Sequence, residues 1–242
     1  RGYWAPDISY SDGRFYITAT LRCNDESEEK RVQMVTSSTS PEGPYCRPSW
    51  IHDDGIDPSL FHDDDGKKYM LLNRGARIFQ LSSNCTEKVG EASLLWLGVC
   101  RKNPEGPRVM KKDGYYYLFL AEGGTGMGHR VTVARSKTLY GPYEPCPHNP
   151  IVRQNDESQL LQCCGHGMVV DTPEGDWYIA YLTLRRSKDG YGFTGRETCI
   201  DPLVWDKDGW PLVNGGKGPG VFSRIPKKTK STKEYPDAEY YP

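Results

Sequence analysis

The sequence predicts an all-β protein that folds as a β-propeller, and three observations support this prediction. Helical periodicity is nearly absent from the 242 residues. A unit of apolar strand, acidic-glycine turn and aromatic-rich strand recurs, and Asp-Gly suits a two-residue hairpin because that turn needs positive φ. The turn glycines lie about 50–60 residues apart, close to the length of a propeller blade. A β-sandwich is the alternative architecture.

The expected hairpins follow one another along the whole chain. They lie at residues 7–21, 58–73, 107–123 and 167–184, and a shorter one at 202–213 closes the series. A second repeat has similar spacing: SSTSPEGPY (37–45) and ARSKTLYGPY (134–143) both place Gly-Pro-Tyr after a serine-containing strand. Four blades are therefore expected within residues 1–216. Residues 217–242 are rich in Gly, Pro and Lys, which predicts a linker or closing tail.

Composition excludes two classes of partner. The chain carries 31 basic and 32 acidic residues, whereas a nucleic-acid surface normally shows a basic excess. No apolar run approaches the roughly 18 residues of a membrane-spanning helix. The aromatic share of 12% fits β-sheets and also fits sugar-binding sites, so it does not distinguish between them.

Eight cysteines leave two readings open. An even count is consistent with disulfides formed outside the cytosol, and buried free thiols are the alternative. None of the cysteines has the spacing of a zinc site. Asn84-Cys85-Thr86 fits a glycosylation sequon. Together these features favour an extracellular location.

Three acidic residues are expected where inner strands of successive units begin. They are Asp7 in YWAPD, Asp57 in GIDPSLF and Glu105 in NPEGPRVM. Such strand starts converge on the central channel of a propeller, and carboxylates that project into one cavity are the equipment of glycosidic bond hydrolysis. Flanking Pro and Gly would fix each backbone without forming a helix. The alternative is that these are ordinary turn residues, as we expect for the acidic run at residues 63–65.

Two further candidates lie at later strand starts. His166 in GHGMVV could hydrogen-bond a sugar, hold an ion in the channel, or simply fill it. Arg196 in TGRETCIDPLVW could orient a carboxylate or a sugar hydroxyl, or form a surface ion pair.

These segments resemble glycoside hydrolase family 43. The similarity is carried, in family order, by GYWAPDISYSDGRFY, GIDPSLFHDDDGKKYML, EGPRVMKKDGYYYLFLAEGGTG, HRVTVARSKTLYGPYEP, GHGMVV and GRETCIDPLVWDKDGWPLV. The motifs are closest to the β-xylosidase and α-L-arabinofuranosidase branch. They cover nearly the whole chain, from residue 2 to about residue 213.

The resemblance implies a five-bladed β-propeller that hydrolyses glycosides with inversion by means of three acidic residues. Glu105 would be the general acid, and Asp57 would raise its pKa and orient it. Trp4 would line the pocket for the terminal sugar, and His166 and Arg196 would contact the sugar or organise the carboxylates. No cofactor is required, although family members often hold calcium or water near this histidine. Asp7 matches a position that is not the family's base.

The resemblance also implies a difference from the family. The family's general base lies on a first blade ahead of WAPD, so we expect this chain to carry blades two to five without that base. The expected function is exo-acting hydrolysis of β-1,4-xylosides, α-L-arabinofuranosides or both, with xylo- or arabino-oligosaccharides as partners. The alternative is a propeller that binds carbohydrate with weak or no hydrolysis, and a third possibility is that Asp7 serves as the base. The sequence predicts no oligomeric state.

Overall fold

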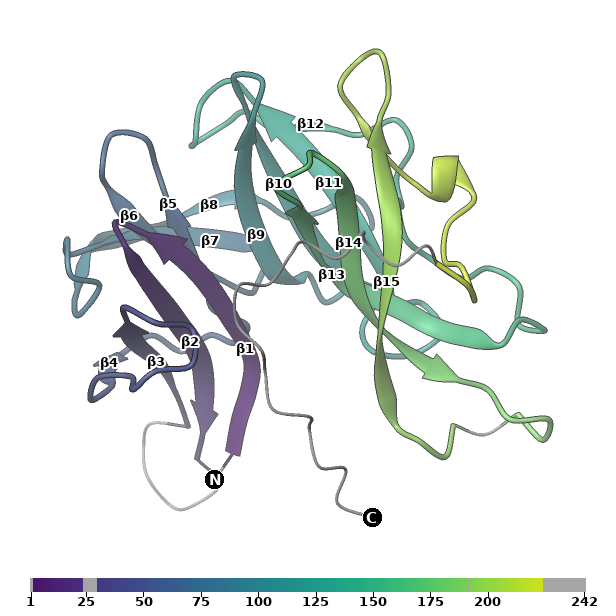
Figure 1. The fold of residues 1–242 in the computed structure, drawn as a ribbon, viewed down its shortest axis with the longest axis horizontal. Helices are drawn as coiled ribbons and strands as arrows, with labels where there is room; N and C mark the ends of the chain where they lie inside the picture. The colour runs from purple at the N-terminus through teal and green to yellow at the C-terminus, as the bar shows by residue number, and fades with distance from the viewer. Residues whose placement is uncertain (1, 24–29, 191, 224–242) are drawn as a thin grey trace.

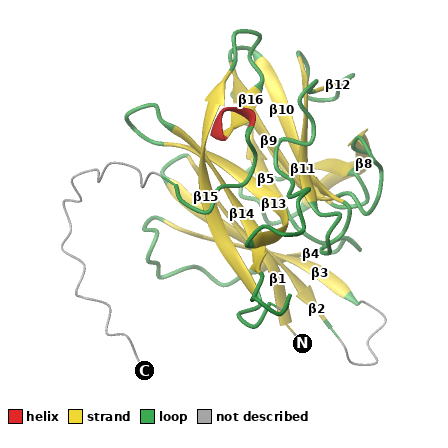
Figure 2. Ribbon diagram, turned by 90° about the vertical axis from the view of Figure 1, so that its right-hand side faces the viewer, coloured by secondary structure: helices red, strands yellow, loops and turns green. Residues whose placement is uncertain are grey.

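The structure is a computed structural model that describes residues 2–23, 30–190 and 192–223. Within these ranges the strands form four sheets of four antiparallel strands each. The sheets follow one another in chain order as the blades of a propeller (Figure 1). The helical content of the described ranges is one short 3-10 helix, η1 (Asn214–Gly216), shown in red in Figure 2. No helix in these ranges is long and apolar enough to span a bilayer.

We name the sheets blades A to D, and each is a meander in which every strand pairs with the next in sequence. Blade A contains β1 (Gly2–Ser11), β2 (Arg14–Arg22), β3 (Arg31–Ser38) and β4 (Ser49–Ile51). Blade B contains β5 (Ser59–His62), β6 (Lys68–Leu72), β7 (Ala76–Leu81) and β8 (Lys88–Trp96). Blade C contains β9 (Glu105–Lys112), β10 (Tyr115–Glu122), β11 (Arg130–Ser136) and β12 (Glu144–Pro145). Blade D contains β13 (Leu161–Asp171), β14 (Trp177–Arg185), β15 (Arg196–Trp205) and β16 (Pro211–Val213).

The predicted hairpins are confirmed, and their turns have the expected backbone. Asp12-Gly13 and Asp113-Gly114 both have positive φ at each of the two turn residues, as the tight hairpin turn requires. The fifth, shorter hairpin is not a separate blade, because β15 and β16 form the outer edge of blade D. The first four hairpins therefore supply the two inner strands of each blade.

The Gly-Pro-Tyr repeat has the same structure in blades A and C. The Gly43–Pro44 and Gly141–Pro142 peptide bonds are both cis. The hydroxyl of Tyr45 donates to the carbonyl of Pro41, and that of Tyr143 donates to the carbonyl of Leu139. In each blade this turn connects the third strand to the fourth. The sequence repeat thus marks a structural repeat.

Three hydrophobic clusters lie between neighbouring blades. One joins blade A to blade B around Tyr16, Val35 and Met70. A second joins blade B to blade C around Leu71 and Leu118, and the third joins C to D around residues such as Phe119 and Ile179. The innermost strands also contact in succession, β1 with β5, β5 with β9 and β9 with β13. Apolar burial between blades, which drives folding, therefore places the four inner strands side by side.

The described cysteines form no disulfide. All eight cysteines lie in the described ranges, and each has a free thiol.

The first part of the predicted tail lies against blade D, because the Gly220 amide and the Ser223 hydroxyl donate hydrogen bonds to the buried carboxylate of Asp201. Residues 224–242, the rest of the predicted linker or tail, lie outside the described residues.

Candidate active site

Five of the six residues selected from the sequence, all except Asp7, line one cavity of about 640 Å³, which we call the central cavity. They come from all four blades: Trp4 from β1, Asp57 from the turn before β5, Glu105 from the start of β9, His166 from β13 and Arg196 from the start of β15. The inner strands thus converge at Trp4, Asp57, Glu105 and His166, whereas Arg196 starts the third strand of blade D. Their roles are considered below.

Left-handed backbone positions bring the side chains into this cavity. Ala5, Asp57, Gly106 and His166 all have φ between 43° and 59°. The pairing registers of β1, β9 and β13 shift close to Trp4, Glu105 and Gly165 respectively. A bulge adds a residue to one strand and re-aims the side chains beside it. The same local device thus acts in the inner strands of blades A, C and D.

Asp57 and Glu105 form a closely spaced pair of carboxyl groups. A carboxylate oxygen of Asp57 lies within 4.8 Å of one of Glu105. The Gly106 amide, directly after Glu105, donates to Oδ2 of Asp57 at 3.1 Å. Only 7% of Asp57 is exposed, and no hydrogen bond links the Glu105 carboxyl to another described residue. The Glu105 carboxyl therefore remains available to a bound molecule.

Burial raises the pKa of both carboxyl groups, and the charge of Asp57 adds to the shift of Glu105. Desolvation and, to a smaller extent, the negative charge of Asp57 raise the pKa of Glu105 to about 7, against the opposing charge of Arg196. Desolvation raises the pKa of Asp57 to about 6, against the Gly106 hydrogen bond and the charges of Arg108 and Arg196. Two adjacent carboxyls with little access to water do not ionise together easily. Up to about pH 7, Glu105 therefore carries a proton that it can donate.

Hydrogen bonds between inner strands fix the backbone that follows each acid. The Thr18 hydroxyl on β2 donates to the carbonyl of Pro58 at 3.0 Å, and the Ser59 hydroxyl on β5 donates to that of Pro107 at 2.5 Å. Both hydroxyls are buried. Blade A thereby holds the strand start of blade B, and blade B holds that of blade C.

His166 and Trp4 supply a neutral and an aromatic wall. Burial, with the nearby charges of Arg108 and Arg196, lowers the pKa of His166 to about 4, so its imidazole is neutral near pH 7. A Cβ on Gly106 would lie 2.8 Å from its Nε2 atom, so only glycine leaves room for the ring. Trp4 is 44% exposed, and its indole offers an open aromatic surface.

Asp7 does not join the other two acids, contrary to the expectation that all three converge. It lies in the middle of β1, beyond the register shift, and only 4% of it is exposed. Its carboxylate forms an ion pair with Arg108 of β9. Arg108 itself lines the central cavity and was missed from the sequence. Its place two residues beyond Gly106 in EGPR was the available signal.

The metal site suggested for His166 has a poor donor set for calcium. His166, Asp57 and Glu105 could each offer one atom within 4.8 Å of the others. Calcium prefers six to eight oxygen ligands, whereas this cluster offers two carboxyl groups with raised pKa values and one imidazole nitrogen. The positive charge of Arg196 acts on both carboxyl groups, and that of Arg108 acts on Asp57. We therefore assign no step to a metal.

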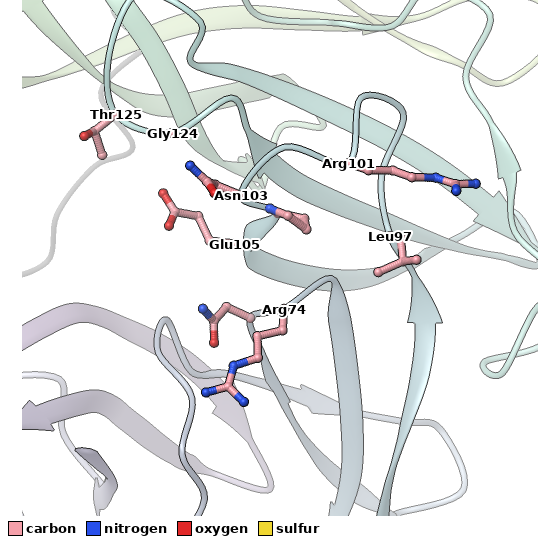
Figure 3. A pocket seen from close by; sticks show the side chains of 9 residues that line it. Arg74, Leu97, Arg101, Asn103, Glu105, Gly124 and Thr125 are labelled. Atoms are coloured by element: carbon pink, nitrogen blue, oxygen red, sulfur yellow. The ribbon is translucent and has the colours of Figure 1, made fainter. Parts of the chain in front are cut away.

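A second cavity of about 650 Å³, the side cavity, adjoins the first. Glu105 and Thr125 line both cavities. The other walls of the side cavity include Arg74, Leu97 and Asn103. Figure 3 shows the Glu105 carboxyl directed toward Thr125, on the side opposite Arg101 and Leu97. Glu105 thus lies at the junction of two cavities.

Comparison with known proteins places this geometry in a family. The family profile described as "Glycosyl hydrolases family 43" matches residues 1–211. The chain belongs to glycosyl hydrolase family 43. The four observed blades match the propeller of family 43 structures with one blade missing.

Family 43 relatives are similar over most of this chain. A xylan 1,3-beta-xylosidase from a Vibrio species is 38% identical over 93% of the chain, and a non-reducing end alpha-L-arabinofuranosidase from Bacteroides ovatus is 36% identical over 88%. The chain covers 47% and 40% of these two proteins. The crystal structure of a family 43 protein from Bacillus licheniformis superposes with a TM-score of 0.91 at 48% identity, over 96% of this chain and 47% of the other. The chain thus spans about half the length of the relatives it matches.

The Asp57→Asn substitution should lower the pKa of Glu105 from about 7 toward 4.5, because it removes the neighbouring negative charge while an amide oxygen can still accept from Gly106. Carbon-13 NMR titration of the glutamate carboxyls measures this pKa. Asp64→Asn, which changes an exposed carboxylate outside the cavity, is the matched control. An unchanged Glu105 titration in Asp57→Asn contradicts the prediction.

Glu105 should also make the stability of the protein depend on pH. Its pKa is raised on folding, so its contribution to stability is complete below about pH 4.5 and is lost as the pH rises through about 7. Glu105→Gln cannot ionise. Urea denaturation at pH 8 should therefore show the variant to be more stable than the natural protein by roughly 1–2 kcal/mol, and at pH 4.5 the two should differ little. Equal differences at both pH values would refute the assignment.

Proposed function

We propose that the protein is an inverting glycoside hydrolase that removes terminal xylose from β-1,4-xylosides, terminal α-L-arabinofuranose, or both. One observation carries the proposal: a carboxyl group whose pKa is raised to about 7 lies where two cavities meet. A general acid must reach the oxygen between two sugars. A group at the junction of the two cavities has that access.

In the proposed reaction the terminal sugar occupies the central cavity and the leaving sugar lies in the side cavity. Glu105 protonates the glycosidic oxygen as its bond to the terminal sugar breaks. The negative charge of Asp57 raises the pKa of Glu105 and so favours its protonated form before the reaction. The Asp57 carboxylate also fixes the start of β9 by accepting a hydrogen bond from the Gly106 amide. His166, Arg196 and Trp4 contact the terminal sugar. Water attacks the opposite face of that sugar, which inverts the anomeric configuration.

The attacking water also needs a general base. In inverting enzymes the acid and base carboxyls lie about 6.5–9.5 Å apart, which leaves room for the water. Asp57 is too close to Glu105 for that role, since their oxygens lie within 4.8 Å. Asp7 is buried and paired with Arg108. The described residues that line the central cavity include no third carboxylate, so the proposal assigns the base to a carboxylate beyond them.

The sugar class rests on the relatives. Those most similar to the chain include proteins named beta-xylosidase, xylosidase/arabinosidase and arabinofuranosidase. We therefore propose xylo- and arabino-oligosaccharides as substrates. An extracellular location remains a prediction from the cysteine count and the sequon, and the free thiols in the structure do not add to it.

Glu105→Gln should abolish the hydrolysis of substrates whose leaving group needs a proton and should largely spare those whose leaving group does not. Removal of a general acid costs roughly 10²–10⁴-fold in rate, so xylobiose turnover should fall by that factor. Turnover of 2,4-dinitrophenyl xyloside should stay within about tenfold of the unchanged protein. The assay is run on this chain and on any longer polypeptide its gene encodes.

Glu144→Gln, the same substitution on the outer strand β12, is the matched control and should leave both rates unchanged. Equal losses on the two substrates in Glu105→Gln would remove Glu105 from the role of acid. A protein without any glycosidase activity would reject the proposed function.

A second candidate function is carbohydrate binding without hydrolysis. The lack of a third carboxylate among the described lining residues favours it. Calorimetry with xylose and xylobiose, run beside the hydrolysis assay, separates the two functions. Heat of binding without turnover supports the second candidate, whereas turnover of xylobiose rejects it.

A further inference from the structure

Glu122 is a fully buried carboxylate with a set of hydrogen bonds that point to one loop. It is the last residue of β10 and has no exposed surface. Its Oε1 atom accepts from the amides of Cys100 and Arg101 at 2.9 and 2.8 Å, and its Oε2 atom accepts from the amide of Val99 at 2.9 Å. The Thr132 hydroxyl donates to Oε2 at 2.6 Å. One carboxylate thus binds three consecutive backbone amides.

These amides belong to the loop of residues 97–104, which leads directly into Glu105. This loop has no regular secondary structure, and two of its residues, Arg101 and Asn103, adopt left-handed φ values of 56° and 47°. Gly98 approaches Glu122 so closely that a Cβ there would lie 2.4 Å from the carboxyl group. The loop is therefore wrapped around the carboxylate. In Figure 3 this loop carries Leu97, Arg101 and Asn103 before it reaches Glu105.

Neighbouring contacts transmit the position of Glu122 to Glu105. The Gly123 amide donates to the carbonyl of Lys102 at 2.7 Å. In the strand ladder Glu105 pairs with Ala121, the residue before Glu122. Ala121 therefore holds Glu105 through strand pairing, while Glu122 and Gly123 hold the loop that precedes Glu105. A charged acceptor forms stronger hydrogen bonds than a neutral one, and here it does so away from water.

We propose that Glu122 is a positioning residue for Glu105, which fixes the loop that aims the acid at the junction of the central and side cavities. Glu122 lines neither cavity and acts only through the loop. The inference rests on the proposed function for its catalytic consequence. Its structural part, that Glu122 holds Glu105 in its half-buried position, can be measured without turnover.

The test is Glu122→Gln, which keeps the size of the side chain and replaces one acceptor oxygen with an amide donor. The loosened loop should admit water to Glu105, so the pKa of Glu105 should fall from about 7 toward 4.5 in a carbon-13 NMR titration. A misplacement of about 1 Å can cost roughly 10²-fold in rate. The kcat for xylobiose should therefore fall about 10–100-fold, while kcat for 2,4-dinitrophenyl xyloside falls less than about threefold.

Asp206→Asn is the matched control. Its carboxylate also accepts two backbone amides, from Asp208 and Trp210, but it lies on the outer edge of blade D. It should change neither the titration nor the ratio of the two rates. If Glu122→Gln does not fold, Thr132→Val removes one of the four hydrogen bonds and should move both readouts in the same direction by a smaller amount.

The outcomes separate this inference from the proposed function. An unmoved Glu105 titration, or equal losses on the two substrates, overturns the positioning role even where the natural protein is an active glycosidase. Absence of hydrolysis in the natural protein rejects the proposed function, and the titration still decides whether Glu122 holds Glu105. A shifted titration together with a loss confined to xylobiose supports the proposal.

Discussion

The site depends on one hydrogen bond, which runs from the Gly106 amide to the carboxylate of Asp57. It joins the inner strands of blades B and C at the point where the two acids meet. It also partly offsets the cost of placing two carboxyls beside each other away from water. The raised pKa of Glu105 lessens this cost as well, because its carboxyl group is neutral below about pH 7. The other contacts around the site place the start of β5 and the start of β9 side by side.

Left-handed backbone positions turn side chains of the inner strands toward the central cavity. Asp57, Gly106 and His166 all adopt this region, and non-glycine residues there cost roughly 1–3 kcal/mol each. Such cost persists only where surrounding structure determines the conformation. Here the Thr18 and Ser59 hydroxyls hold the neighbouring carbonyls, and the clusters between blades fix the strands themselves. The packing and hydrogen bonds of the blades thus stabilise the strained backbone positions at their inner edge.

The sequence predicted the blades well because their signals are local. Asp-Gly turns and alternating aromatic strands lie within about 15 residues, so each hairpin could be assigned alone. Glu105 and Asp57 could be selected because Pro and Gly surround them in matching units. The ion pair of Asp7 with Arg108 could not, since the register shift in β1 and contact between blades A and C decide it. Glu122 was also missed, because a buried glutamate at a strand end resembles any other until the loop around it is seen.

The three hydrophobic clusters have a consequence for how the protein would lose its fold. Each cluster couples only one blade to the next, so cooperativity passes along the chain as it does in a linear array of repeats. Local opening then begins wherever the weakest junction lies. The central cavity, however, takes a wall from every blade. The cavity is therefore only as durable as the least stable blade, and partial unfolding anywhere in the array dismantles it while most of the sheet structure still stands.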